Sequence, residues 1–177
     1  MIRYSFACLN KRMFLNLYTA LIRPLIEYCV QVWSPHLIKH ISLLEGVQRR
    51  ATKMVPELKN LPYEERLDKL KLTTLLERRV RGDMIETYKI ITNKESVNPS
   101  KFFQMKRVRT GDRVKTLKVK SFKRYKRSHY FTHRVINRWN KLSHEEVTAE
   151  KTSNFKKMYD KMERERKDAR RNDIYEW

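Results

Sequence analysis

Apolar residues recur along this chain at steps of three and four positions, the spacing that places side chains on one face of an α-helix. The first stripe predicts a helix from about residue 13 to residue 22, which Pro24 should end or kink because proline lacks a backbone N–H. A second helix is expected to begin with Pro24 in its first turn and to stop at Ser34-Pro35. A third is expected from residue 36 to about 55. Its expected inward face consists of Ile38, Ile41, Leu44, Val47, Ala51 and Met54.

Further helices are expected on both sides of a gap in this pattern. "YEERLDKLKL" has the spacing of a short helix. Thr74 and Glu77 have the spacing of a capping box, in which each side chain accepts a hydrogen bond from the backbone N–H of the other, so a longer helix should run to about residue 92. Helical spacing returns at Ser128, a residue suited to an N-cap, and again from about Ser153.

The segment between these helical regions has no helical spacing, and "LKVKSFK" alternates weakly enough to allow a short strand. A tract this basic should be mobile unless a partner neutralises it. The pattern therefore predicts three parts. Residues 1–100 form a helical domain, residues 101–127 a basic linker and residues 128–177 a C-terminal helical region.

The composition favours an all-α fold. The 177 residues include only 3 Gly and 5 Pro, whereas 34% are charged, a mixture more typical of helices than of a sandwich or barrel. The apolar fraction of 40% is sufficient for one thin core or two small ones. We expect a small helical bundle, followed by the basic irregular tract and the C-terminal helices.

The charge is large and unevenly distributed. The formal net charge is +21, and residues 101–141 hold 15 basic residues and one acidic residue. A field of this sign indicates a polyanionic partner, with nucleic acid first and an anionic membrane surface second.

The cysteines and the apolar segments bear on location. Cys8 and Cys29 lie in apolar patterns without C-x-x-C spacing, so we expect reduced thiols and an intracellular protein, cytoplasmic or nuclear. No secretory signal is recognisable. The longest apolar region is interrupted by Arg23, Pro24 and Glu27, and no transmembrane segment is predicted.

Catalytic constellations are missing from the sequence. The aspartates stand singly, so they do not form the close acidic pair that holds two metals for nucleotidyl transfer, and three glycines cannot supply a phosphate loop. The pairs His36 with His40 and His129 with His133 have a four-residue step but lack a third ligand. They are interpreted as capping or surface histidines, and we predict no metal site, no cofactor and no enzymatic activity for the chain alone.

Basic residues alternate with aromatic residues in "KSFKRYKRSHYFTHR". This combination can neutralise phosphates and stack on bases. A solvated basic linker whose aromatic residues anchor it to the core is the simpler alternative, and an anionic membrane or an acidic protein would also suit the pattern. Because the tract is so one-sided in charge, nucleic acid is favoured. The candidate contact residues are Lys120, Lys123, Arg124, Tyr125, Lys126 and Arg127.

Four motifs occur in the order "LYTALIRPLIEYCVQVWSP", "LEGVQRRATKMV", "LPYEERLDKLKLTTLLERRVRGDMIETYKI" and "HRVINRWNKLS". Together they resemble the region after the polymerase palm in reverse transcriptases of jockey-like, non-LTR (LINE-type) retrotransposons. The resemblance implies a helical thumb with a C-terminal extension that holds template and primer, an RNA or RNA–DNA hybrid. It implies binding roles for Gln48, Arg49, Arg50, Lys53, Arg78, Arg79 and Arg81.

The chain departs from that family in its chemistry. The aromatic-x-Asp-Asp turn that carries the family's catalytic aspartates has no counterpart here. The resemblance therefore implies a fragment of an RNA-directed DNA polymerase that is not catalytic alone, and the family's Mg²⁺ would belong to the missing palm.

The segment "RPLIEYCVQVWSP" would pack at the base of such a thumb, against the palm. Without a palm, part of its apolar surface has no covering. We therefore expect an exposed apolar patch near Tyr28, Val32 and Trp33, which would contact the missing palm or cause self-association through the N-terminal helices.

Overall fold

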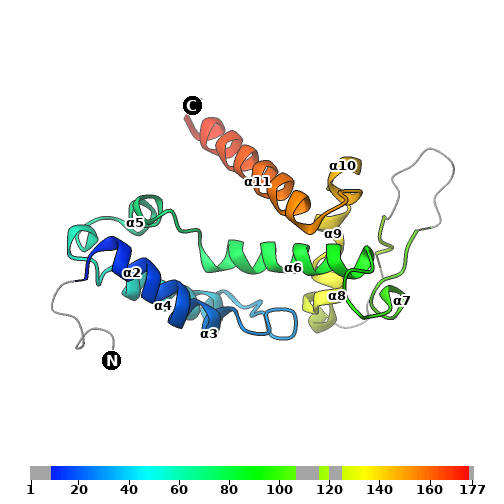
Figure 1. Cartoon of the computed structure of the whole chain (residues 1–177), viewed down its shortest axis with the longest axis horizontal. Helices are drawn as coiled ribbons and strands as arrows, with labels where there is room; N and C mark the ends of the chain where they lie inside the picture. The colour runs from blue at the N-terminus through cyan, green and yellow to red at the C-terminus, as the bar shows by residue number, and fades with distance from the viewer. Residues whose placement is uncertain (1–8, 107–115, 120–124, 176–177) are drawn as a thin grey trace. The chain divides into compact units, whose positions relative to one another are not determined.

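The computed structural model describes residues 9–106, 116–119 and 125–175, and it contains two compact units, Met1–Gly82 and Asp83–Trp177 (Figure 1). Every regular element among the described residues is a helix, and the only β pairing in this part of the chain is an isolated antiparallel bridge between Met105 and Leu117. The prediction of an all-α fold is confirmed. Along the sequence the first unit ends at Gly82, within a helix, whereas the pattern placed the end of the first domain near residue 100.

The first unit begins with a nearly continuous helical path. Helix α2 (Lys11–Leu17) is capped by Asn10, whose side chain accepts a hydrogen bond of 2.9 Å from the Met13 N–H. A π-helical turn (Tyr18–Ile22) leads into α3 (Arg23–Glu27), with Pro24 in its first turn as predicted. Because Pro24 has no N–H, the usual bond to the carbonyl four residues earlier cannot form, and the wider turn lies just before it.

The predicted continuation of the second helix to residue 33 is wrong. Helix α3 ends at Glu27, and Tyr28 has extended backbone angles. Cys29 follows with a φ of 48°, in the left-handed region that a right-handed helix cannot include. The chain therefore turns here, and the Val32 N–H donates to the Cys29 carbonyl at 2.9 Å.

Helix α4 (Ile38–Thr52) lies within the predicted range but buries a different face. Ile38 is 81% exposed, and the buried side chains of α4 include the polar Glu45 and Gln48. Of the predicted inward positions, only Ala51 is fully buried. The apolar stripe is therefore offset from the most buried face. Of its other members, Ile41, Leu44, Val47 and Met54 are partly buried and only Ile38 is exposed, because hydrogen-bonding partners from other segments surround the adjacent polar side chains.

The rest of the first unit closes around a small core. A 3₁₀ turn (Pro56–Leu58) precedes α5 (Tyr63–Leu70). Helix α5 starts after Pro62 and ends at Lys71, whose φ is 53°. The core cluster consists of Leu9, Phe14, Tyr18, Ala51, Val55, Leu58 and Leu70.

Helix α6 (Leu75–Ile91) begins in the first unit and ends in the second. Its start matches the prediction in part, since the Thr74 hydroxyl oxygen accepts a hydrogen bond of 3.2 Å from the Glu77 N–H. The helix ends one residue before the predicted position, and Asn93 then has a φ of 54°.

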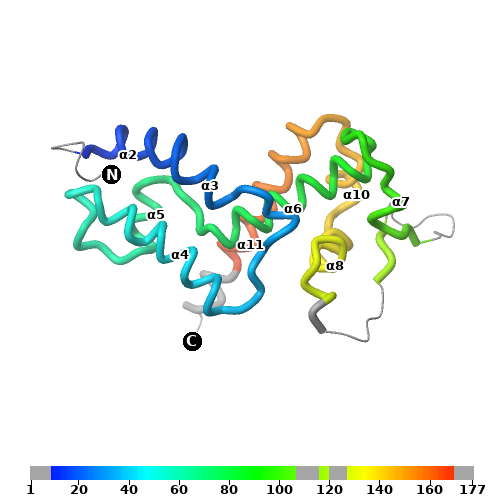
Figure 2. Tube along the Cα trace, turned by 90° about the horizontal axis from the view of Figure 1, so that it is seen from below, coloured from blue at the N-terminus to red at the C-terminus, as the bar shows by residue number. Residues whose placement is uncertain are grey.

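The second unit packs short helices against the end of α6 and the start of a long C-terminal helix. Its elements, which can be followed along the trace in Figure 2, are α7 (Pro99–Phe102), a 3₁₀ helix (Tyr125–His129), α8 (Phe131–Arg134), α9 (Ile136–Trp139), α10 (His144–Val147) and α11 (Thr152–Tyr175). Tyr88 and Phe155 stack in the core with ring centroids 4.3 Å apart, and Trp139 is 1% exposed beside them.

The tract expected to be a linker contributes to this core. Phe103 and Leu117 are 4% and 0% exposed and belong to the same apolar cluster as Trp139. Residues 107–115 and 120–124 of the tract expected to be mobile lie outside the described residues. Of the weak strand pattern "LKVKSFK", the structure describes residues 117–119, and Leu117 forms the bridge to Met105.

Candidate nucleic-acid interface

The last turns of α4 present a group of exposed cations on the first unit. Arg49, Arg50 and Lys53, all predicted contact residues, are exposed. The Arg49 guanidinium lies over the Tyr63 ring, 4.7 Å from its centroid, which holds one of the three in place. None of the three forms an ion pair with a residue in the described ranges.

Gln48, the fourth residue predicted from the same motif, lies inside the unit and is 0% exposed. Its side-chain N–H groups donate to the Tyr63 hydroxyl at 2.9 Å and to the Thr73 carbonyl at 3.0 Å, and its oxygen accepts from the Tyr18 hydroxyl. All the groups of the amide therefore bind protein partners, and Gln48 has no surface through which a nucleic acid can reach it.

Glu45 completes this buried network. Its carboxylate accepts hydrogen bonds from the Tyr63 hydroxyl and, at 3.0 Å, from the Leu75 N–H. The network thus joins α4 to the preceding π-helical turn, to α5 and to the start of α6. Such a set of satisfied polar groups specifies one arrangement of the core.

Burial changes the acidity of the tyrosines in this network. Burial, partly offset by the nearby Arg23, raises the pKa of Tyr18 from 10.0 to about 12, and burial together with the Glu45 carboxylate raises the pKa of Tyr63. A pKa that is higher in the folded state means that stability is complete below the unfolded value and is lost as pH rises through the folded value. The first unit should therefore lose stability between pH 10 and pH 12.

We expect the urea midpoint of the first unit to fall across that pH range, and to fall less steeply in Tyr18→Phe, which has no phenol to ionise at this position. Urea titrations at several pH values, followed by circular dichroism, measure both slopes. Equal slopes in the two proteins would contradict the assignment to Tyr18.

The arginines predicted from "ERRVR" hold a neighbouring segment of the first unit. Arg78 forms an ion pair with Glu27, with Nη2 and Oε2 separated by 2.9 Å. Arg79 is 4% exposed, donates to the Ile26 carbonyl at 3.0 Å and lies over the Trp33 ring at 5.1 Å. Arg81 is partly buried and has interactions of its own. Arg78 and Arg79 therefore fix the end of α3, and Trp33 after it, to α6.

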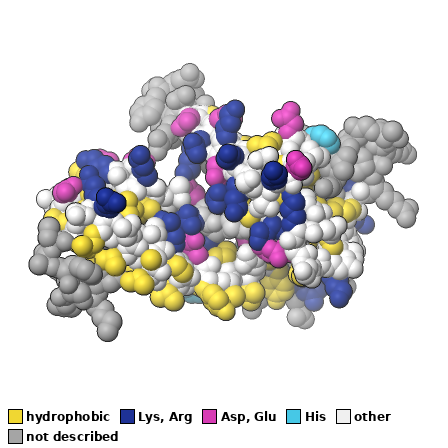
Figure 3. All heavy atoms as spheres, viewed as in Figure 1, with side chains coloured by type: hydrophobic (Ala, Val, Ile, Leu, Met, Phe, Trp, Pro, Cys, Tyr) yellow, Lys and Arg dark blue, Asp and Glu magenta, His cyan; other side chains and the backbone are white. Residues whose placement is uncertain are grey.

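The apolar surface expected after α3 is present. Tyr28, Val32 and Trp33 are 71%, 84% and 42% exposed, which confirms their predicted exposure. Figure 3 shows hydrophobic side chains gathered over the region of α2 to α4. Which partner covers this surface stays a prediction.

The predicted contacts in the basic tract are described only in part. Arg127 is exposed at the 3₁₀ helix. The backbones of Tyr125 and Lys126 belong to the same helix, but the structure does not describe their side chains. Lys120, Lys123 and Arg124 lie outside the described residues.

A pocket in the second unit, lined by both polar and apolar side chains, was not predicted. The chain segments around Gln104 and Leu117 run antiparallel, with the Lys106 N–H bonded to the Thr116 carbonyl at 2.8 Å and the Lys118 N–H bonded to the Gln104 carbonyl at 2.7 Å. Asn140 fixes this pairing from outside: its amide donates to the Leu117 carbonyl and accepts from the Leu117 N–H, both at 2.9 Å.

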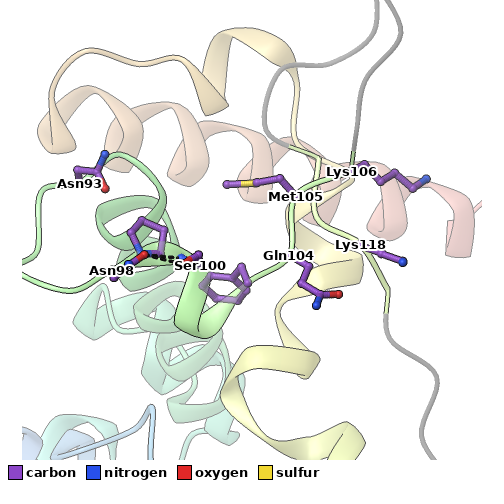
Figure 4. Close-up of a pocket in the computed structure, with 9 residues that line it drawn as sticks. Asn93, Asn98, Ser100, Gln104, Met105, Lys106 and Lys118 are labelled. Carbon is purple, nitrogen blue, oxygen red and sulfur yellow. Dashed lines mark hydrogen bonds between the residues drawn. The ribbon is translucent and has the colours of Figure 1, made fainter.

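The pocket next to this pairing has a volume of about 1050 Å³ and opens to solvent (Figure 4). It is lined by Asn93, Asn98, Pro99, Ser100, Phe103, Gln104, Met105, Lys106 and Lys118. These described lining residues include two cations and no carboxylate. Two local signals in the sequence lie at this pocket: Asn98-Pro99, a pair that favours a turn, and the weak alternation of "LKVKSFK", which includes Lys118. Neither indicates that the two segments pair with each other.

The described residues show no metal centre and no helix long and apolar enough to cross a membrane. Within these ranges no three His, Cys, Asp or Glu residues are grouped so that they could hold an ion. Of the two histidine pairs, His36 and His40 are exposed, whereas His129 and His133 are partly buried and have interactions of their own. The finding that no helix could cross a membrane likewise applies only to the described residues.

Comparison with known proteins gives no relative, because no family profile, no curated sequence and no solved structure matches this chain.

Proposed function

We propose that this chain binds nucleic acid without catalysing a reaction on its own, as the thumb and C-terminal extension of a non-LTR retrotransposon reverse transcriptase. It holds RNA or an RNA–DNA hybrid mainly through phosphates. The four motifs in the order of that family support the proposal, together with the net charge of +21. The described residues offer no group of three carboxylate, histidine or cysteine ligands for Mg²⁺.

The observation that carries this proposal is the exposed, unpaired group formed by Arg49, Arg50 and Lys53. An ordinary solvated surface mixes charges of both signs, so its cations meet carboxylates. These three do not do so among the described residues. Arg and Lys side chains of this kind bind phosphates, and the affinity that they supply depends on salt and little on sequence.

The triple variant Arg49→Ala, Arg50→Ala, Lys53→Ala is expected to weaken binding to an RNA–DNA hybrid. Each lost phosphate contact should reduce the slope of log K against log salt by about one. Fluorescence anisotropy of a labelled hybrid between about 50 and about 200 mM salt measures affinity and slope together. The matched control is the triple variant Lys39→Ala, Lys59→Ala, Lys69→Ala. These lysines are exposed elsewhere on the same unit, and replacing them removes the same charge.

If both triple variants weaken binding equally, the net charge and not this surface is responsible. Binding that keeps a sharp sequence preference at high salt would contradict a phosphate-based mode. The alternative function is an interaction module that holds an acidic protein or an anionic membrane surface, and uptake of the chain by anionic vesicles without any binding to nucleic acid would favour it.

A further inference from the structure

The pocket in the second unit differs from a simple basic surface in the kinds of side chain that line it. Figure 4 shows Lys106 and Lys118 toward one end, Asn93, Asn98 and Ser100 toward the other, and Gln104 and Met105 between them. A purely electrostatic phosphate site needs only the cations. The neutral hydrogen-bonding groups at the other end are suited to a ligand that carries more than a phosphate.

The amides are arranged so that donors remain available. The Asn98 oxygen accepts hydrogen bonds from the Ser100 N–H at 3.0 Å and from the Ser100 hydroxyl at 2.7 Å. This orients the amide and leaves its NH₂ group for a ligand. The side chains of Asn93 and Gln104 form no hydrogen bond with another described residue. Asn98 therefore offers a donor, whereas Asn93 and Gln104 each offer a donor and an acceptor, the pair that matches the edge of a nucleic-acid base.

The pocket also has an apolar wall and a rigid frame. Pro99, Phe103 and Met105 supply apolar surface, and the Phe103 ring is held edge-on against Phe131 with centroids 5.9 Å apart. The two backbone bonds at Lys106 and Lys118 fix the positions from which the lysines extend. A volume of about 1050 Å³ is ample for one nucleotide.

From these features we infer that the pocket receives an unpaired nucleotide of a single strand. Its base lies toward Asn98 and Gln104, and its phosphate lies on Lys106 and Lys118. In a duplex the base edges that hydrogen-bond are already paired, whereas a single strand can turn a base into such a pocket. This inference rests on the proposed function and adds to it a preference for unpaired strands at this site.

The test compares wild type with two variants of the full chain. Gln104→Leu removes the amide but keeps the backbone carbonyl that bonds Lys118, and Lys106→Ala with Lys118→Ala removes the cations. The probes are a labelled single-stranded RNA 12-mer, an RNA–DNA hybrid of the same length and adenosine monophosphate. Anisotropy gives the affinities, and circular dichroism verifies that the variants fold.

We expect Gln104→Leu to weaken single-strand binding about 5- to 100-fold, the range for loss of a specific base contact, and to leave hybrid binding unchanged. The lysine double variant should weaken single-strand binding as well and reduce its salt slope by up to about two. Adenosine monophosphate should bind far more weakly than the 12-mer, since it lacks the flanking phosphates.

Three results would overturn the inference while leaving the proposed function intact: single-strand binding unchanged in both variants, equal losses for single strand and hybrid in Gln104→Leu, or mononucleotide binding as tight as that of the 12-mer. If the wild-type chain binds neither the single strand nor the hybrid at about 50 mM salt, the proposed function itself fails.

Discussion

Replacing Gln48 with alanine is expected to lower the free energy of unfolding of the first unit by about 2–5 kcal/mol. The Tyr18 hydroxyl would lose its acceptor and the Thr73 carbonyl its donor, both inside the unit, and each buried polar group left without a partner costs about 1–3 kcal/mol. Tyr63 keeps its bond to Glu45, so it adds little. Urea unfolding followed by circular dichroism measures the loss.

The resemblance implies a different result, because it assigns Gln48 to nucleic-acid binding. Lys53→Ala provides the comparison on the same helix, since its side chain is exposed and such substitutions usually change stability by less than about 0.5 kcal/mol. We expect Gln48→Ala to reduce stability and Lys53→Ala to reduce affinity. If Gln48→Ala leaves stability unchanged and weakens binding, the role assigned here to the network is wrong.

This contrast shows what periodicity can and cannot predict. The spacing of apolar residues located α4 to within a few residues, because any helix with a buried face produces such spacing. It did not select the most buried face, since Ile38 is exposed and Glu45 and Gln48 are buried, whereas most of the stripe is partly buried. Glu45 and Gln48 are core residues because partners distant in sequence, Tyr18 and Tyr63, form hydrogen bonds with them, and no local pattern contains that information.

The same limit applies to the candidate interface. Local spacing predicts which residues share a helix, but it does not predict which distant residues bind them. Arg49, Arg50 and Lys53 follow one another on a helix, so their shared exposure could be predicted from sequence. Arg78 and Arg79 were equally good candidates by composition, but Glu27 and the Ile26 carbonyl, more than 50 positions away, bind them. The pocket depends on the bridge between Met105 and Leu117, a tertiary pairing without a sequence pattern.

The motif "HRVINRWNKLS" now has a structural explanation that the resemblance alone did not provide. Trp139 fills the core of the second unit, and Asn140 holds Leu117 and with it the frame of the pocket. Arg134 forms two hydrogen bonds with the Asp83 carboxylate, of 2.8 and 2.9 Å, and one with the His129 carbonyl at 3.1 Å. The motif therefore assembles the unit that carries the pocket.

Arg134→Ala is expected to lower the free energy of unfolding of the second unit by about 3–5 kcal/mol, the usual cost of removing one partner of a buried ion pair. The Asp83 side chain is only 7% exposed, so its carboxylate would lose the guanidinium without gaining water. Arg134 joins α8 to α6, and the loss should separate these helices before the core melts. Urea unfolding, followed by circular dichroism and by tryptophan fluorescence, to which the buried Trp139 contributes, measures the change without screening the ion pair.

The double variant Asp83→Leu, Arg134→Met distinguishes the ion pair from the packing around it. Replacing both partners with apolar residues of similar size removes the buried charges together, so most of the lost stability should return. Recovery would show that the single variant fails because Asp83 is left charged and buried. If the double variant is as unstable as Arg134→Ala, the orientation of α8 and α6 depends on the bidentate ion pair itself. In that case the pocket that Asn140 holds in place should lose single-strand binding in the single variant and in the double variant.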